Sequence, residues 1–472
     1  MDKNKELAKN TIIIMVGKIC TQFMSFFLLP LYTAVLSTQE YGIVDLVVTY
    51  TSLLMPVVLF QIDQALFRFL IDERKNEVKK KEIISTAVSF AVVQMIAVIV
   101  IFAVIQSFVS FQYKWFLLFN VLASIGANMM LQTARGFGDN VGYAMGSCVS
   151  AATQIIGNVL FLVVLKMGVS GMLTATVLAH LMVVAFLCVK EKVCRYLSPK
   201  AISKVRLREI LKYSVPLIPN ALSWWVLHAS DRTIVLLFLG TSYNGLLSVA
   251  NKFSSLCISV YNIFNISWTE SAALHMNDPD REKFFSSVIV SAFKLFMCVA
   301  TGVVACMPFV FPLMVNSKFQ EAYAVVPIYL LASMLNIVVG LYSVVYVALK
   351  KSKELAMTSI YSGIINIVAH LVLIKFVGLY AAALSTAIAF GVMAVYRYFD
   401  LKKYINIVLP KRWIILTIAA YAVACYGFYS PSFPIQVIVL LVIALYSVII
   451  NREILLEGMR IITHRKREKN KV

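Results

Sequence analysis

The sequence predicts an all-α polytopic membrane protein with about 14 transmembrane helices, and three observations support this fold class. Of the 472 residues, 60% are hydrophobic and only 14% are charged, whereas a soluble domain is about one quarter charged. The hydrophobic residues form long, nearly uninterrupted segments. Lysine and arginine fall mainly in the short links between these segments, which is where they determine membrane topology.

Fourteen apolar segments are long enough to cross a hydrocarbon core, which takes roughly 20 residues of helix. The first is too long for the apolar region of a signal peptide and lacks a convincing cleavage site, so we expect it to remain as helix 1. In chain order the segments are 11–36, 44–70, 83–108, 115–134, 141–165, 168–189, 214–239, 245–269, 285–312, 322–349, 355–376, 378–399, 413–429 and 433–450.

Links that are rich in lysine and arginine alternate strictly with links that have few, so the basic residues gather on one side of this map. One side carries 33 lysines and arginines, the other carries 4, and the remaining 6 of 43 lie inside segments. The positive-inside rule then predicts that both termini lie in the cytoplasm. The net charge of +20 therefore reflects topology and not a nucleic-acid partner. We expect the basic tail 464–472 to face anionic membrane lipids.

Cysteine and histidine form no recognisable site. The eight cysteines are scattered through apolar segments without a Cys-x-x-Cys pair, and the five histidines have no ligand spacing. We therefore predict neither disulfides nor a bound metal, and no cofactor.

The chain also repeats itself. Residues 36–42, LSTQEYG, precede IVDLVVTYTSL, and residues 239–245, LGTSYNG, precede LLSVANKFSSL, in a constant register of 203 residues. This predicts two six-helix lobes, 1–200 and 201–405, followed by two extra helices and a basic tail in 406–472. Transporters built from such repeats place their substrate site between the repeats.

The hairpin 230–252 carries three ionisable residues inside predicted membrane helices, Asp231, Arg232 and Lys252. Each costs about 2.5–3.5 kcal/mol at the bilayer centre on insertion scales, and such residues usually face a bundle interior or a watery cavity. At 1.5 Å per residue, both cations lie about 10 Å inside the outer ends of their helices. We expect Asp231 to hold Lys252 and to leave Arg232 free for a ligand. The alternative is a purely structural ion pair.

Other charges lie in the inner half of the predicted bundle. Lys18 and Asp63 are each about 10 Å from the cytoplasmic ends of helices 1 and 2, so they are placed to pair, and Lys294 is similarly deep in helix 9. Arg68 and Arg397 lie within about a turn of the surface, and we expect them to snorkel towards water.

Polar residues recur at helical spacing on two of these segments. Helix 8 places Lys252, Ser255, Ser259, Asn262 and Thr269 on one face, and helix 2 does likewise with Asp45, Thr49, Ser52, Pro56 and Asp63. Such stripes form either interhelical hydrogen bonds or a hydrophilic cavity. Cations in a cavity suit an anion such as phosphate or pyrophosphate. The acidic residues would bind a coupling proton or sodium ion, or would neutralise the cations; they are Asp45, Asp63, Asp231 and Glu270.

Several stretches together resemble the polysaccharide flippases, the Wzx-type O-antigen and capsule transporters of the multidrug/oligosaccharidyl-lipid/polysaccharide (MOP) exporter superfamily. They are residues 11–46, Asp231-Arg232 with LGTSYNGLLSVANK, the Arg135-Gly136-Phe137-Gly138 turn and residues 350–389. The resemblance implies flipping of an undecaprenyl-pyrophosphate-linked oligosaccharide through a two-lobed cavity. It also implies membrane lipids and export-pathway proteins, such as a polymerase, as partners.

The resemblance carries over to a few positions. Asn251-Lys252 stands where related lipid II flippases have an acidic-basic pair facing the cavity, Asp231-Arg232 matches a pair common in polysaccharide flippases, and Lys18 falls near their basic positions in helix 1. Combined with the stripes, this gives the predicted substrate-binding set Lys18, Arg232, Lys252, Lys294, Asn251, Ser255, Ser259 and Asn262.

Three other functions stay open at this point. A wall-precursor flippase or a drug antiporter would have the same fold, although four cavity cations would repel cationic drugs. A membrane polysaccharide polymerase would be an enzyme and would be expected to show a large outer loop with catalytic arginine and histidine. The longest outer link here has about ten residues, so we predict no catalytic residues.

Overall fold

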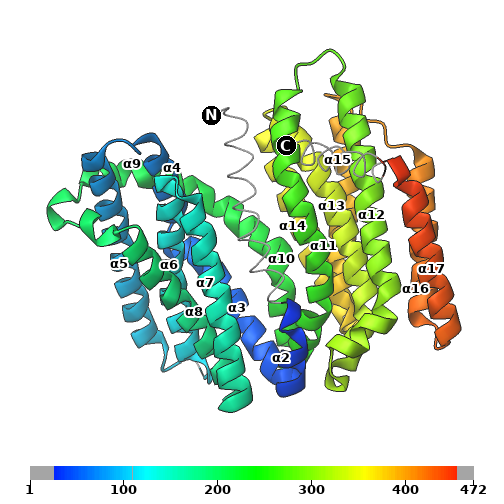
Figure 1. Ribbon diagram of the computed structural model, residues 1–472, viewed down its shortest axis with the longest axis horizontal. Coiled ribbons are helices and arrows are strands. Elements are labelled where there is room, and N and C mark those ends of the chain that lie inside the picture. Colours follow the sequence, from blue (N-terminus) through cyan, green and yellow to red (C-terminus); the bar gives the residue numbers. More distant parts are fainter. Residues whose placement is uncertain (1–25, 109, 454–455, 457–472) are drawn as a thin grey trace, which may run out of the picture. The chain divides into compact units, whose positions relative to one another are not determined.

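The computed structural model describes residues 26–108, 110–453 and 456 and confirms the all-α polytopic membrane class. The described residues form sixteen α-helices, α2 to α17, and no strand (Figure 1). Eleven helical segments in this part of the chain are long and apolar enough to cross a membrane. α10 and α11, which carry Arg232 and Lys252, are not among them because polar residues lower their hydropathy.

The chain forms two compact units, Met1–Ser248 and Val249–Val472, with the boundary inside α11. In the first unit α6 packs against α3, α4 and α8, α7 packs against α8, and α10 packs against α3. Fully buried apolar side chains, among them Leu66, Ile125 and Leu187, fill the space between these helices. The helices are α2 (Leu29–Val35), α3 (Thr38–Val58), α4 (Ile62–Asp72), α5 (Glu77–Ile105), α6 (Lys114–Phe137), α7 (Asn140–Asn158), α8 (Gly168–Lys190), α9 (Lys204–Ser214) and α10 (Ile218–Phe238).

Local sequence explains where several of these helices begin and end. Ser37 and Glu40 form a capping box that satisfies the first N–H groups of α3. Gly138 ends α6 at φ +88°, a left-handed conformation that costs glycine little, and the Asp139 side chain then caps α7 by accepting from the Gly142 N–H.

The prediction of one continuous helix over 44–70 is wrong. Phe60 and Gln61 both adopt left-handed backbone angles, φ 50° and 56°, and these separate α3 from α4. Pro56 lies one turn before this break and supplies no N–H for the helical ladder. As a result Asp63 lies in the first turn of α4 and not on the polar stripe of α3. Discontinuous membrane helices of this kind are common at transporter binding sites.

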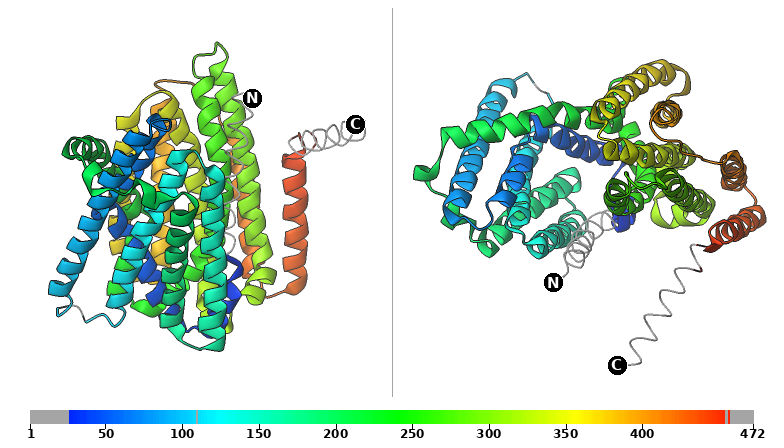
Figure 2. Two further views of the ribbon diagram at one scale, coloured as in Figure 1. Left: turned by 60° about the vertical axis from the view of Figure 1, so that its left-hand side comes forward. Right: turned by 90° about the horizontal axis from the view of Figure 1, so that it is seen from above.

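The second unit is a bundle in which α15 packs against α13 and α14, and α12 packs against α13. α16 and α17 pack against each other and against α12, so they flank the bundle on one side (Figure 2). The helices are the greater part of α11 (Thr241–Leu274), then α12 (Arg281–Met314), α13 (Val326–Ala348), α14 (Ser352–Val377), α15 (Tyr380–Leu401), α16 (Lys411–Tyr429) and α17 (Phe433–Ile450).

Each unit contains a buried asparagine that donates a hydrogen bond to a hydroxyl group on another helix. Asn158 and Asn366 are fully buried, with 0% and 1% of their surface exposed. Asn158 donates to the Tyr32 hydroxyl at 2.8 Å, and Asn366 donates to the Thr386 hydroxyl at 3.2 Å. Each bond ties two helices of one unit together through buried side-chain groups. The proposed lobe boundaries at residues 200 and 405 stay a prediction.

Candidate functional site

The first unit contains a close crossing between the start of α3 and the start of α11. Both helices begin at a threonine, Thr38 and Thr241, 203 residues apart. A Cβ added to Gly42 would collide with the Thr241 carbonyl oxygen, and a Cβ added to Gly245 would collide with the Thr38 carbonyl oxygen. The two contacts are reciprocal, as at an interface with two-fold symmetry. Residues that are 203 positions apart in the sequence are therefore related by a local pseudo-two-fold axis at this crossing.

Asp45 and Ser248 meet beside this crossing and are also related by 203 residues. The Ser248 hydroxyl donates to Asp45 Oδ1 at 2.7 Å. Arg232 approaches the other oxygen from α10, with Nε 2.7 Å from Asp45 Oδ2. Asn244 fixes the backbone of α10 at the same place by donating to the Arg232 carbonyl oxygen at 3.1 Å. Three helices thus supply one carboxylate, one guanidinium and one hydroxyl to a single cluster.

This cluster is mostly buried, and its most exposed member is Asp45, with 18% of its side-chain surface exposed. Arg232 is 7% exposed and its neighbour Asp231 is 5% exposed. The expectation that Arg232 has no counter-ion is wrong, because Asp45 provides one. The carboxylate comes from α3, outside the hairpin, so the spacing within the hairpin does not reveal it. The predicted pairing of Asp231 with Lys252 stays a prediction.

The Arg232–Asp45 contact is held by charge more than by an aligned hydrogen bond, because Asp45 Oδ2 has no hydrogen-bond partner of good geometry among the described residues. A buried ion pair compensates the desolvation of its charges only when the geometry is excellent and the other polar atoms are satisfied. An incoming anion with better geometry can therefore compete with Asp45 for the guanidinium.

Two tyrosines flank Asp45 along α3, Tyr41 on one side and Tyr50 on the other. Tyr41 is buried beside Asp45 and Ser248, and its ring lies 6.0 Å from that of Tyr32. One turn further along α3, the hydroxyls of Tyr50 and Thr233 are 3.2 Å apart. This second contact again joins α3 to α10, so the helix that carries Arg232 is fixed to α3 at two levels.

The polar stripe of α11 runs along a face that is partly open. The hydroxyl of Ser255 donates to the Lys252 carbonyl, and that of Ser259 donates to the Ser255 carbonyl. Asn251 accepts from Ser254 at 2.8 Å. Asn262 and Glu270 are exposed, and Lys252, Ser255 and Ser259 are half-buried. Each of these two serines donates to a carbonyl of its own helix, as serine in membrane helices commonly does.

The remaining predicted residues lie in other places. Lys18 lies outside the described residues. Asp63 is buried at the start of α4 and accepts from the Gln64 amide at 2.7 Å. Lys294, on α12, has its Nζ 4.9 Å from the centre of the Trp413 ring. Arg68 is exposed and pairs with Asp72 at 2.5 Å.

Arg397 differs most from its predicted position. It does not snorkel: only 1% of its surface is exposed. Its guanidinium donates to five acceptors on two other helices. These acceptors are the Val339 carbonyl and Ser343 hydroxyl on α13, and on α14 the Leu355 carbonyl and the hydroxyls of Thr358 and Ser359. A signal existed, since Ser343, Thr358 and Ser359 are hydroxyl residues near the ends of otherwise apolar segments.

Comparisons with known proteins agree on the fold. The model of a family described as "Polysaccharide biosynthesis protein" matches residues 7–268. A solved structure of the lipid II flippase MurJ in an inward closed conformation aligns with a TM-score of 0.69 and 14% identity, covering 95% of this chain and 100% of that one. No curated protein matches the sequence.

Two transporter structures extend this likeness. An inward-facing multidrug resistance MATE transporter of the MOP superfamily aligns with a TM-score of 0.65 and 10% identity, covering 83% of this chain and 98% of that one. A MOP superfamily transporter from Pyrococcus furiosus, whose binding pocket is described as having reverse polarity, aligns with a TM-score of 0.54 and 14% identity, covering 85% and 96%. The fold is thus that of MOP-type transporters and flippases.

Proposed function

This chain belongs to the polysaccharide biosynthesis protein family, and from that premise we propose that it flips an undecaprenyl-pyrophosphate-linked oligosaccharide across a bacterial cytoplasmic membrane. Transport runs from the cytoplasmic to the outer leaflet, with both termini in the cytoplasm. The family description and the MOP-type fold support a flippase of polysaccharide biosynthesis. The observation that carries the substrate class is a buried cation, Arg232, whose carboxylate partner a phosphate can replace.

The mechanism is an exchange of counter-ions at Arg232. In the resting state Asp45 neutralises the guanidinium at 2.7 Å. A pyrophosphate offers Arg232 the two-pronged geometry that guanidinium prefers. When the pyrophosphate takes the place of Asp45 beside Arg232, Asp45 still accepts the hydrogen bond that the Ser248 hydroxyl donates at 2.7 Å. The pyrophosphate then adds its negative charge to the site, and Asp45 loses its cationic partner.

The rest of the predicted set is proposed to contact the same substrate. The half-buried and exposed stripe of α11 is open to glycan hydroxyl groups, with Lys252 as a second point charge for phosphate. Lys18 stays a predicted contact of the substrate, and polymerase or other export-pathway proteins stay predicted partners. The contacts of α11 in this set are Asn251, Lys252, Ser255, Ser259 and Asn262.

Reconstitution in liposomes tests the proposal. Flipping of a fluorescent lipid-linked oligosaccharide is measured for the wild-type chain and for R232A and K252A. Both variants are expected to lose flipping, because the pyrophosphate then enters a low-dielectric bundle without its cation. The matched control is R68A, which removes an exposed arginine paired only with Asp72 and is expected to flip normally. Normal flipping by R232A and K252A together would overturn the proposal.

A wall-precursor flippase is the second candidate, favoured by the 0.69 TM-score to MurJ over 95% of this chain. The same liposomes, loaded with lipid II in place of the lipid-linked oligosaccharide, separate the two functions. Transport of lipid II alone would assign the chain to wall synthesis. Transport of a cationic drug by the same preparation would instead favour the antiporter reading, which the MATE fold also accommodates.

Ion coupling is proposed for the acidic residues, Asp45, Asp63, Asp231 and Glu270. Asp63 and Asp231 are buried and Asp45 lies in the ion pair, so a change in their charge state alters the energy of the bundle, whereas Glu270 is exposed. Flipping is expected to depend on a proton or sodium gradient, and D63N is expected to weaken that dependence. Flipping that is indifferent to both gradients would remove the coupling proposal and leave the substrate proposal intact.

A further inference from the structure

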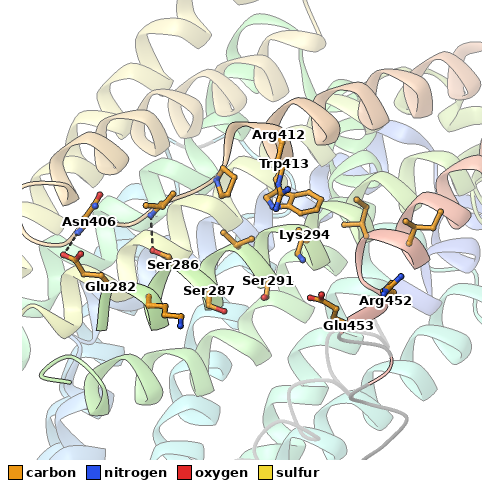
Figure 3. Close-up of a pocket in the computed structure, with 16 residues that line it drawn as sticks. Glu282, Ser286, Ser287, Ser291, Lys294, Asn406, Arg412, Trp413, Arg452 and Glu453 are labelled. Carbon is orange, nitrogen blue, oxygen red and sulfur yellow. Dashed lines mark hydrogen bonds between the residues drawn. The ribbon is translucent and has the colours of Figure 1, made fainter. Parts of the chain in front are cut away.

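The second unit contains a charged hollow of about 940 Å³ where α12, α16 and α17 approach the link 402–410 (Figure 3). Its cations come from three different segments: Lys283 and Lys294 from α12, Arg412 from the start of α16, and Arg452 just after α17. Two carboxylates, Glu282 and Glu453, also line it. The lining therefore carries an excess of positive charge.

One wall of the hollow is an extended strap that α12 holds in place. Ile405, Ile407 and Leu409 are buried in alternation, which turns Asn406 and Val408 towards the hollow. The Asn406 N–H donates to Glu282 Oε1 at 3.1 Å, and the Val408 N–H donates to the Ser286 hydroxyl at 3.0 Å. Glu282 is thus already engaged with the backbone. The wall is fixed before any ligand arrives.

Two of the cations lie against one aromatic ring. Lys294 Nζ is 4.9 Å and the Arg412 guanidinium carbon is 4.8 Å from the centre of the Trp413 ring. Figure 3 shows Arg412, Trp413 and Lys294 as neighbours at the upper wall of the hollow. In the part of the chain that the structure describes, neither cation makes an ion pair. Trp413 holds both without neutralising them, so an anion that enters meets two charges at one place.

The helices that form the hollow continue as apolar surface. Ile415 on α16, and Leu445, Val448 and Ile449 on α17, each expose more than half of their side-chain surface. α17 is among the helices apolar enough to cross a membrane, and few of its residues are buried. A ligand that fits both regions has an anionic head for the hollow and hydrocarbon chains for the helix faces. Tryptophan is common at this level of a bilayer, between hydrocarbon and headgroups.

We propose that this hollow binds the phosphate headgroup of an anionic membrane glycerophospholipid, with Lys294 and Arg412 as the principal contacts and Trp413 between headgroup and acyl chains. Basic pockets between membrane helices are a physical match for such headgroups. The bound lipid joins α12 to α16 and α17, the pair of helices that flanks the bundle. The site is separate from the Arg232 cluster and does not depend on which glycan the chain transports. It assigns Lys294 to a resident lipid and not to the transported one.

Native mass spectrometry of the full-length chain, released from nanodiscs containing phosphatidylglycerol and phosphatidylcholine, tests the proposal. The wild-type chain is expected to retain phosphatidylglycerol in preference to phosphatidylcholine. K294Q/R412Q is expected to weaken phosphatidylglycerol binding roughly 30-fold, from the loss of two basic contacts. The matched control R195Q/K200Q removes one arginine and one lysine that are exposed in the link after α8 and is expected to retain the lipid. K294R/R412K keeps both charges and is expected to bind as the wild type does.

Four outcomes would count against the proposal. Equal loss of phosphatidylglycerol from K294Q/R412Q and from R195Q/K200Q would show general surface charge and no site. Unchanged binding by K294Q/R412Q would place the lipid elsewhere. Displacement of phosphatidylglycerol by an equimolar isoprenyl pyrophosphate would identify the hollow as a binding site for the transported lipid. Loss of binding by K294R/R412K at an unchanged melting temperature would count against charge as the cause.

Discussion

Arg232 and Arg397 are both buried in membrane helices, yet their surroundings differ in kind. Arg232, in the first unit, faces a carboxylate, Asp45, through an ion pair of 2.7 Å. Arg397, in the second unit, donates to hydroxyl and carbonyl groups and makes no ion pair among the described residues. The first arrangement neutralises a charge, and the second disperses it over neutral dipoles.

The difference indicates different roles. A carboxylate partner can be exchanged for another anion, so Arg232 suits a site where a charged group arrives and leaves. Hydroxyls and carbonyls that belong to two neighbouring helices cannot be exchanged without separating those helices. Arg397 therefore suits a permanent joint between α13, α14 and α15. The predictions below test this division.

The largest effect is expected for R232M. Removal of one partner from a buried ion pair leaves the other charge uncompensated, which costs about 3–5 kcal/mol. The melting temperature of the purified chain should fall accordingly, and D45N in the R232M background should restore part of it. If R232M melts like the wild type, the two arginines do not differ in the way described.

Two substitutions of Arg397 sharpen the contrast. R397K keeps the charge but loses the planar fork, and roughly 1.5–3 kcal/mol of stability should be lost with the charged hydrogen bonds. R397M removes the charge as well and should cost less, because the hydroxyls of Ser343, Thr358 and Ser359 keep their bonds to backbone carbonyls. Thermal unfolding measures both. The reverse order, with R397M the more damaging, would mean that the charge of Arg397, and not its planar fork, stabilises this joint.

The glycine crossing allows a geometric test of the first site. G42A places a methyl group against the Thr241 carbonyl, and G245A places one against the Thr38 carbonyl. Each should cost roughly 1–3 kcal/mol from overpacking, and the two losses should be similar because the contacts are reciprocal. G302A is the matched control, since nothing lies within 4 Å of a Cβ at that position. A neutral G42A would mean that the crossing relaxes without effect on its surroundings.

The smallest effect is expected for an ion pair outside the membrane segments. Lys190 pairs with Asp139 at the start of α7, and the two side chains are 29% and 32% exposed. Although burial acts to raise it, Lys190 and the Gly142 N–H hold the pKa of Asp139 below its ordinary value. This stabilisation is present at neutral pH and is lost as the pH falls through that lowered pKa. K190Q should cost only about 0–1 kcal/mol, measured by thermal unfolding at pH 7.

Most of the fold was predictable because apolar length and basic links determine membrane helices one by one. The sequence did not show which helices pack beside a given residue. The depth of Arg397 along α15 was estimated correctly as one turn from its end, but α13 and α14 cover that end, and sequence spacing does not show coverage. The break at Phe60 and Gln61 was missed because neither residue is a glycine, and only the tertiary structure holds them in left-handed conformations.

The candidate site was predictable in part. Arg232 and Asp45 were each identified as membrane charges, yet they were assigned to different groups. The register of 203 residues equates Asp45 with Ser248, and residues equivalent under a two-fold axis meet when they lie close to it. If residues related by the register are assumed to be in contact, Asp45 is placed at the axis, within reach of the helix that carries Arg232.

The crossing at Gly42 and Gly245 also constrains the history of the molecule. If the two repeats arose by duplication of one ancestral segment, every residue at the axis first faced its own copy. An aspartate at position 45 would then have faced a second aspartate, and two like charges at hydrogen-bond distance repel strongly in a low dielectric. The present site has serine opposite Asp45 and leucine, Leu29, at the position equivalent to Arg232. The two halves therefore differ today at both members of the charged pair, which breaks the symmetry of the axis.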